Sequence, residues 1–207
     1  MNDIDVVNED TKEKVVEVIA KLGYRPNIIV KSLKTLKTST IGMVIPDISS
    51  QFYPEIVRGA EDVSSIYNYN IILCNTDNDS QKEMEYLNVL KEKMIDGVLY
   101  MSSSLENNII ELINSLQIPM VFIEMTDSKH FLRSVTIDNE KAAYDGVQYL
   151  INNKNKKIEY NGTHEKTLNA GALRYNGYKK ALNDNGIEID TRVVNSSGIK
   201  AKDGLDV

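Results

Sequence analysis

Four short apolar segments recur at nearly even intervals through the middle of the chain, and this recurrence restricts the possible folds more than any other feature. The segments are IGMVI from Ile41, NIILC from Asn70, DGVLY from Asp96 and MVFI from Met120. Each gap between them holds one amphipathic helical pattern. Strands that are apolar throughout and alternate with helices form parallel sheets that are covered on both faces. The sequence therefore predicts an α/β fold built on a parallel sheet.

The three intervening helical patterns place apolar residues on one face, at spacings of three and four. We expect these faces to cover the sheet. The predicted core positions are Ile56, Val57, Ala60 and Val63 in the first pattern, Met84, Leu87, Leu90 and Met94 in the second, and Ile109, Leu112, Ile113 and Leu116 in the third. Cys74 lies inside an apolar segment, which indicates a small buried hydrophobe rather than a reactive thiol.

The alternation becomes less regular after residue 123. SVTID, residues 134–138, is a short extended segment, and residues 139–153 follow as a helical pattern. Its spacing predicts one inward face. The residues on that face are expected to be Ala142, Ala143, Val147 and Leu150.

A second strand and helix series then begins. KKIEYN, residues 156–161, predicts a strand with Glu159 near its centre, where a buried carboxylate would need a partner. NAGALRYNGYKKALNDNG predicts a helix that is ended by Gly186. We expect a complete first subdomain over residues 39–138 and an incomplete second subdomain over residues 139–207.

Two helical patterns precede the first strand and are separated by a proline. Asn8 is placed to cap the first pattern, EDTKEKVVEVIAKLG, and Gly23 to end it. Pro26 prevents simple continuation, and Asn27 can cap the second pattern, IIVKSLK. A helix this short is marginal in isolation. It should form mainly when something docks on it.

Positive charge is concentrated in this same region. Residues 21–38 hold five Lys or Arg and no Asp or Glu, in a chain with 24 basic and 30 acidic residues and a formal charge of −6. The remainder of the chain therefore carries about −11. The overall charge of −6 argues against a protein coated in positive charge for general nucleic-acid binding. The positive field is confined to one short segment.

The sequence shows neither a membrane span nor a secretory signal. It has no apolar run of about 18 residues, and its first residues, MNDIDVVNED, are acidic and polar. The single cysteine cannot form an internal disulfide, which agrees with a reducing compartment. We expect a cytoplasmic protein.

No motif in the sequence supports catalysis. No glycine lies between Gly42 and Gly59, so the glycine-rich fingerprint of a dinucleotide site is missing after the first strand. His130 and His164 are not spaced with Cys or acidic residues as metal ligands would be. The serines from Ser102 onward are expected to form a polar loop, and G-x-S-x-G is absent. We predict a protein that is not an enzyme and uses no cofactor and no metal.

A small-molecule site is still possible outside the carboxyl ends of the strands, where open α/β sheets bind ligands. The DISSQFY segment offers the hydroxyl of Ser49 and the aromatic face of Phe52, which suits a sugar or a base, although such a loop can be purely structural. Asp138 and Asn139 could bond ligand hydroxyls or cap the following helix. Arg174 could reach a carboxylate or phosphate, or lie on the surface.

Seven motifs lie between Gly23 and Leu182, and the match to a known family that they carry covers nearly all residues from 6 to about 190. In chain order they are GYRPN, IVKSLK, TIGMVIPDISSQFYPEIVRGAED, IILCNTDND, DGVLYMSS, SVTIDNEKAAYDGV and RYNGYKKAL. In this order and spacing they resemble the bacterial lactose-repressor (LacI/GalR) family of transcription regulators, and most of all its catabolite control protein A branch. The resemblance implies a periplasmic-binding-protein-like effector core after a partial helical headpiece, residues 1–26, and a hinge helix with its linker, residues 27–38.

The resemblance also implies that the hinge helix binds DNA. Leu33 is similar to the family's leucine that wedges into a minor-groove base step, with Ile29 and Val30 as its apolar companions. Such a wedge kinks the duplex while adjacent lysines neutralise phosphates. The predicted DNA-binding residues are Arg25, Asn27, Ile29, Val30, Leu33 and Lys34.

The partners that the resemblance implies are a double-stranded DNA operator, a sugar or sugar phosphate effector, a phosphocarrier protein and a second copy of the chain as a homodimer.

The sequence also departs from the family pattern at several places. The chain starts beyond the two helices that precede the third in the family, Val30 stands where alanine is usual, and the family's Gly and His are replaced around residues 153–155. We therefore expect a regulator truncated at both ends, without base-specific readout.

Three functions stay open. The first is a repressor-type, DNA-binding regulator, with a role in carbon catabolite control. The second is a sugar-binding module related to periplasmic receptors, without DNA binding, against which the missing signal peptide and the GYRPN motif count. The third is a nonfunctional fragment, which a broad, noncooperative thermal melt would support.

Overall fold

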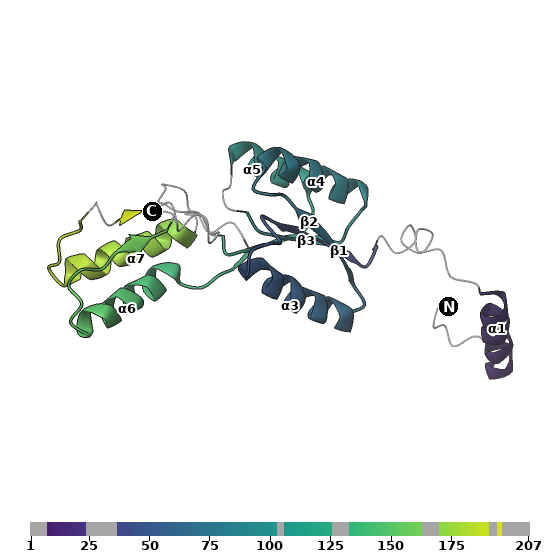
Figure 1. The fold of residues 1–207 in the computed structure, drawn as a ribbon. Helices are drawn as coiled ribbons and strands as arrows, with labels where there is room; N and C mark the ends of the chain where they lie inside the picture. Colours follow the sequence, from purple (N-terminus) through teal and green to yellow (C-terminus); the bar gives the residue numbers. More distant parts are fainter. Residues whose placement is uncertain are drawn as a thin grey trace. The chain divides into compact units, whose positions relative to one another are not determined.

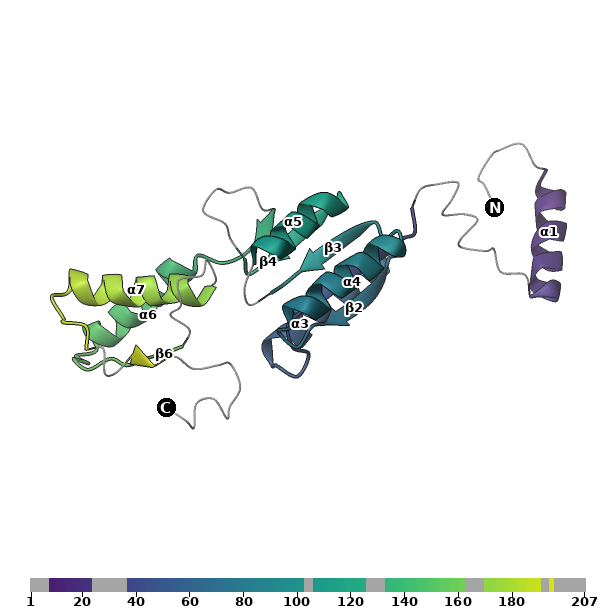
Figure 2. The same cartoon turned by 90° about the horizontal axis from the view of Figure 1, so that it is seen from above.

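The chain divides into two compact units, residues 1–38 and residues 39–207. Figures 1 and 2 show its ribbon from two directions. The computed structural model describes residues 8–23, 37–102, 106–125, 133–162, 170–190 and 194–195.

The described part of the first unit is one helix, α1 (Glu9–Leu22). The side chain of Asn8 accepts a hydrogen bond from the backbone N–H of Asp10 at 3.1 Å, so the predicted cap is confirmed. Gly23 ends the helix in the left-handed conformation with φ 59°, also as predicted. The predicted hinge helix and all six predicted DNA-binding residues, which fall within residues 25–34, lie outside the described residues.

The second unit contains a five-stranded sheet in which every neighbouring pair is parallel. Its spatial order is β2-β1-β3-β4-β5. The first four strands lie at the four predicted apolar segments. The strands are β1 (Thr40–Ile45), β2 (Asn70–Asn75), β3 (Gly97–Tyr100), β4 (Met120–Ile123) and β5 (Ser134–Val135).

Helices cover both faces of this sheet. In Figure 1, α3 (Phe52–Ile66) lies on one side, and α4 (Ser80–Glu92) and α5 (Asn107–Leu116) lie on the other. Alternate residues of β1 point to opposite faces. Val44 packs into the core under α4 and α5, whereas Met43 and Ile45 pack against α3. The predicted covered parallel sheet is therefore confirmed.

The core beneath α4 and α5 is the larger of the two. Tyr100 is fully buried there, and its ring meets that of Phe122 edge to face, with centroids 5.5 Å apart. Such a pair adds to the free energy gained from burial of the two rings. Cys74 is 4% exposed, as predicted, and burial raises the pKa of its thiol to about 11. The other buried members of this core are Val44, Leu87, Leu90, Ile95, Val98, Ile109, Leu116 and Met125.

Two of the core residues predicted for the helices that cover the sheet are wrong. Val63 is 54% exposed, because the buried stripe of α3 continues from Ala60 by four residues to Ser64 instead of by three. Met94 is 55% exposed, because α4 ends at Glu92 and Met94 adopts a left-handed φ of 52°. The next residue, Ile95, is buried in its place.

Residues 139–190 contain a packed pair of helices, α6 (Asn139–Asn152) and α7 (Ala170–Asp184). Their shared core consists of Val147, Tyr178, Ala181 and Leu182, with Tyr144 and Ile151 packed against it. The inward face of α6 is therefore correct for Val147 and wrong for Ala142 and Leu150, which are exposed. Tyrosine and isoleucine side chains bury more apolar area than alanine, and they set the rotation of the helix.

The strands of this second half are shorter than predicted. Only Tyr160–Asn161 of the expected strand over residues 156–161 pair, as β6, with β7 (Val194–Asn195) in parallel. Glu159 is exposed, so no buried carboxylate arises there. Gly186 follows the end of α7 with φ 65°, as the predicted stop requires. Among the described residues, no helix is both long and apolar enough to cross a membrane.

The contact between α6 and α7 gives a direct stability test at Gly177. A Cβ atom at this position would overlap the backbone oxygen of Glu140 and lie 2.9 Å from the backbone nitrogen of Tyr144. We expect Gly177→Ala to lower the free energy of unfolding by about 1–3 kcal/mol, measured by urea denaturation, because the two helices must separate. The matched control is Gly146→Ala on α6, where the added Cβ meets nothing within 4 Å. That variant should keep or raise stability through its higher helix propensity. Equal effects of the two substitutions would contradict this packing.

Candidate ligand-binding site

Polar side chains gather where the parallel strands end. Because all the strands run in one direction, their carboxyl ends meet at one edge of the sheet, which we call the carboxyl edge. The register places Ile45 beside Asn75 and Val44 beside Tyr100. The polar residues at or just beyond the ends of β1 to β4 include Asp47, Ser49, Asn75, Thr76, Ser102 and Glu124.

The loop after β1 is held in place by two side chains. The carboxylate of Asp47, which is 6% exposed, accepts hydrogen bonds from the backbone N–H of Ser49 at 2.9 Å and from its hydroxyl at 2.6 Å. The side-chain oxygen of Asn75, at the end of β2, accepts from the backbone N–H of Ile48 at 2.7 Å. The Ser49 hydroxyl proton is therefore engaged, while its oxygen can still accept a hydrogen bond from a ligand.

Phe52 presents an aromatic surface next to this loop. It is the first residue of α3, its side chain is 49% exposed, and its ring meets that of Tyr53 edge to face at 5.2 Å. Burial and the nearby Asp47 carboxylate raise the pKa of Tyr53, so this phenol stays protonated. An exposed ring held by a packed neighbour suits stacking on the apolar face of a sugar.

A second set of contacts continues along the edge after β2. The Asn75 amide donates to Asp77 at 2.6 Å, and Lys82 forms an ion pair with the same carboxylate at 2.7 Å. Hydrogen bonds from Lys82 and from Asn75 lower the pKa of Asp77, and the Asp77 carboxylate raises the pKa of Lys82. Asn75 thus links the loops that follow β1 and β2.

A buried acid lies at the end of β3. Glu83, in the first turn of α4, is 3% exposed and accepts a hydrogen bond from the hydroxyl of Tyr100 at 3.2 Å. The side chain of Ser102 hydrogen-bonds to both of these groups. Burial raises the pKa of Glu83, and the carboxylates of Glu106 and Asp79 raise it further, while the bonds from Ser102 and Tyr100 oppose the shift.

The other three predicted ligand-binding residues form hydrogen bonds within the chain. Asp138 caps α6 by accepting from the backbone N–H of Lys141 at 2.9 Å. Asn139 is 2% exposed, and its side-chain nitrogen donates to Glu124 at 3.2 Å and to the backbone oxygen of Ile137 at 3.3 Å. The exposed Arg174 donates from Nε to the backbone oxygen of Ala170 at 3.1 Å.

The five predicted ligand-binding residues therefore form two neighbouring pairs and one single residue. Ser49 and Phe52 lie together beside the end of β1, and Asp138 and Asn139 lie together at the start of α6. Arg174 lies on α7. The hydrogen bonds of Asp138 fit its interpretation as a helix cap.

The sequence prediction missed Asp47, Asn75 and the Glu83 network. One signal was present for Glu83, which precedes Leu87 by four residues and therefore lies on the buried stripe of α4. An acidic residue on an apolar stripe indicates a buried hydrogen-bonded network. Asp47 carried no such signal, because its partners depend on how the loop folds back.

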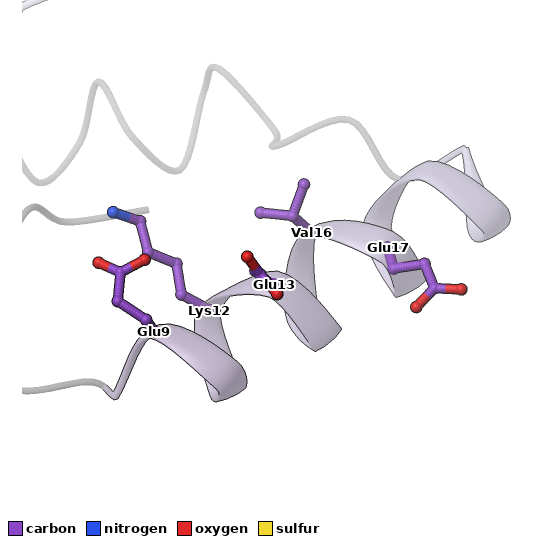
Figure 3. Close-up of a pocket in the computed structure, with 5 residues that line it drawn as sticks. All are labelled: Glu9, Lys12, Glu13, Val16 and Glu17. Atoms are coloured by element: carbon purple, nitrogen blue, oxygen red, sulfur yellow. The ribbon is translucent and has the colours of Figure 1, made fainter.

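Two hollows are lined by residues other than those of the carboxyl edge. One, of about 340 Å³, follows a single face of α1 and is lined by Glu9, Lys12, Glu13, Val16 and Glu17 (Figure 3). The other, of about 490 Å³, lies between α3 and β2, and its lining includes Ser64, Tyr69 and Leu73. Within the described ranges, no three His, Cys, Asp or Glu side chains come close enough to hold a metal ion. His130 and His164 fall outside those ranges.

A covered parallel sheet with an ordered polar carboxyl edge is typical of α/β domains that bind small molecules. The family of periplasmic binding proteins and the sugar-binding domain of the LacI family matches residues 38–206. The chain belongs to this family, and both the predicted fold class and the predicted family are confirmed.

The relatives of the chain are transcription regulators. The HTH-type transcriptional regulator RegA of Clostridium saccharobutylicum is 58% identical over 206 residues, which are 100% of this chain and 62% of RegA. Catabolite control protein A of Priestia megaterium is 40% identical over 206 residues, which are 96% of this chain and 62% of that protein. The chain thus spans about three fifths of the length of these relatives.

Solved structures agree with this placement. The transcription regulator CcpA of Lactococcus lactis has a TM-score of 0.74 and 36% identity, over 80% of this chain and 60% of CcpA. The complex of the transcriptional regulator CelR with cellobiose has a TM-score of 0.69 over 98% of this chain and 61% of CelR. At 22% identity, CelR shares the fold.

The raised pKa of Glu83 predicts a pH-dependent stability. The folded state holds the Glu83 proton more tightly than the unfolded chain does, so stability falls as pH rises from the ordinary pKa of 4.5 through the raised folded value. Glu83→Gln removes this loss. We expect its thermal midpoint, relative to that of the unsubstituted chain, to be higher at pH about 7.5 than at pH about 4.

The control for this experiment is Glu85→Gln, an exposed residue on the same helix. Between the two pH values, the thermal midpoint relative to the unsubstituted chain should change more for Glu83→Gln than for Glu85→Gln. If Glu83→Gln and the unsubstituted chain showed parallel pH profiles across this range, the buried acid would not be the group that titrates.

Proposed function

We propose that the chain acts in a DNA-binding transcription regulator of repressor type, in which residues 39–207 sense a small-molecule effector. The 58% identity to RegA over the whole chain is the main support for this proposal. The catabolite control protein A relatives favour a role in carbon catabolite control. This role consists of binding rather than catalysis and belongs in the cytoplasm.

The proposed division of labour within the chain agrees with its two compact units. Residues 1–26 are part of the headpiece, and residues 27–38 are the hinge helix and linker that bind the operator. The concentration of five basic residues and no acidic residue in residues 21–38 supports this assignment. Arg25, Asn27, Ile29, Val30, Leu33 and Lys34 are the proposed DNA contacts. Residues 39–138 and residues 139–207 are the proposed first and second effector-binding subdomains.

The proposed effector is a sugar or a sugar phosphate bound at the carboxyl edge. The exposed ring of Phe52 and the ordered loop around Ser49 support a sugar site there. Asp138, Asn139 and Arg174 complete the proposed effector-binding set. A second copy of the chain and a phosphocarrier protein are the further proposed partners. Sugar binding without any DNA affinity would favour instead a receptor-like module.

Phe52 is the most direct test of the effector site. With cellobiose and glucose 6-phosphate as probes in isothermal titration calorimetry, we expect Phe52→Ala to raise the Kd of the bound sugar about tenfold, because a stacked ring contributes about 1.4 kcal/mol. Folding should be unchanged, since half of the side chain is already exposed. The control is Val63→Ala, an exposed residue of the same helix, which should bind as tightly as the unsubstituted chain.

Two results would argue against this site. If the unsubstituted chain bound a sugar and Phe52→Ala bound it equally well, the site would lie elsewhere. If neither probe bound at all, the sugar class of the effector would be wrong.

The proposed contacts of the hinge residues with DNA can be tested separately, through DNA affinity and its dependence on salt. In fluorescence anisotropy with double-stranded DNA, Lys34→Gln should make the slope of log K against log salt less negative by about 0.9, because one fewer counterion is released. Leu33→Ala should weaken binding at every salt concentration without changing this slope, because the wedge is apolar.

Lys91→Gln is the control for the charge change, since Lys91 is an exposed residue of α4 in the other unit. Its slope should equal that of the unsubstituted chain. If the unsubstituted chain failed to bind DNA even at low salt, the regulator proposal would fail for this chain.

A further inference from the structure

Glu83 occupies a position where an apolar residue would complete the buried stripe of α4 with Leu87 and Leu90. Burial of a carboxyl group there costs free energy unless its oxygens are hydrogen-bonded. The charged groups that act on it are the carboxylates of Glu106 and Asp79, which gives no favourable ion pairing. The stabilising contacts of Glu83 are instead the hydroxyls of Tyr100 and Ser102.

These two hydroxyls mark the point at which the chain leaves the sheet. Tyr100 is the last residue of β3, and the backbone N–H of the following residue, Met101, still bonds to Val44 at 2.9 Å. Ser102 comes next and is only partly buried. The Glu83 side chain therefore joins the first turn of α4 to the first residue beyond β3, at the carboxyl edge.

We propose that Glu83 is a positioning residue for the ligand-binding site, because its carboxyl group fixes the exit of the chain from β3 through the hydroxyls of Tyr100 and Ser102. This inference rests on the proposed effector site at the carboxyl edge. The loop after β1 is held by Asp47 and Asn75, and the Glu83 network does the same after β3. A site whose walls are fixed before the ligand arrives loses less conformational entropy on binding.

The first test removes one hydroxyl group. Tyr100→Phe keeps the buried ring and its contact with Phe122, and deletes only the donor to Glu83. In amide NMR spectra of the chain, we expect the Ser102 resonance to shift and its hydrogen exchange to accelerate about tenfold. The matched control is Tyr178→Phe, which deletes a different buried phenol whose hydroxyl donates to the backbone oxygen of Ile158 at 2.9 Å. It should leave Ser102 unchanged. An unchanged Ser102 in Tyr100→Phe would overturn the proposal.

The second test separates hydrogen bonding from simple filling of space. Glu83→Gln keeps an acceptor for the two hydroxyls, and Glu83→Leu keeps bulk but removes every acceptor. We expect Glu83→Gln to match the unsubstituted chain at Ser102 and in sugar affinity within about twofold, and Glu83→Leu to reproduce the Tyr100→Phe spectrum and raise the Kd about fivefold. Indistinguishable Gln and Leu variants would show that Glu83 only fills volume, and would overturn the proposal.

The Ser102 amide resonance tests the role of Glu83, and sugar binding by the unsubstituted chain tests the proposed function. A chain that binds neither cellobiose nor glucose 6-phosphate contradicts the proposed sugar effector, and the Ser102 amide still decides whether Glu83 fixes the end of β3. A shifted Ser102 amide in Tyr100→Phe together with an unchanged Kd would overturn the connection between this network and the ligand site.

Discussion

Burial of both faces of a parallel sheet is the constraint on which the rest of this structure depends. Val44, Tyr100 and Phe122 pack under α4 and α5, while Met43 and Ile45 pack under α3. Strand interiors that are buried on both faces leave no place for polar side chains except at the strand ends. Because the strands are parallel, their carboxyl ends lie at one edge, and polar chemistry is collected there.

Internal hydrogen bonds hold this edge in shape. Asp47 and Asn75 fix the loop after β1, and Glu83 connects α4 with the end of β3. Networks of this kind stabilise one arrangement only when their members are satisfied, and no buried side-chain nitrogen or oxygen in the described part of the chain is without a partner. The exposed ring of Phe52 stands beside this fixed edge, which makes it available to a ligand.

The spacing of apolar residues predicted the main strands and helices, because the side chains that an element buries recur at the repeat of that element. It failed where the choice between spacings of three and four depended on tertiary contacts, as at Val63 and Ser64 of α3 and at Leu150 and Ile151 of α6. The place of the candidate site was predictable from the strand ends. The partners of Asp47 were not, because they form only when the loop folds back on β2. The hydrogen bonds of Asn139 to Glu124 and to Ile137 likewise depend on tertiary contacts that spacing does not reveal.

The sugar site that we propose at the ordered carboxyl edge is the part of this account that most needs a direct test. Titration of cellobiose or glucose 6-phosphate into the amide-labelled chain, followed by NMR chemical shifts, tests it most directly. We expect the shifts to concentrate at residues 47–53, 75–77 and 101–102, where the fixed loops and Phe52 lie, and at the other proposed effector-binding residues, Asp138, Asn139 and Arg174. Shifts confined to α1 or to the hollow between α3 and β2, or no shifts at all, would contradict this account.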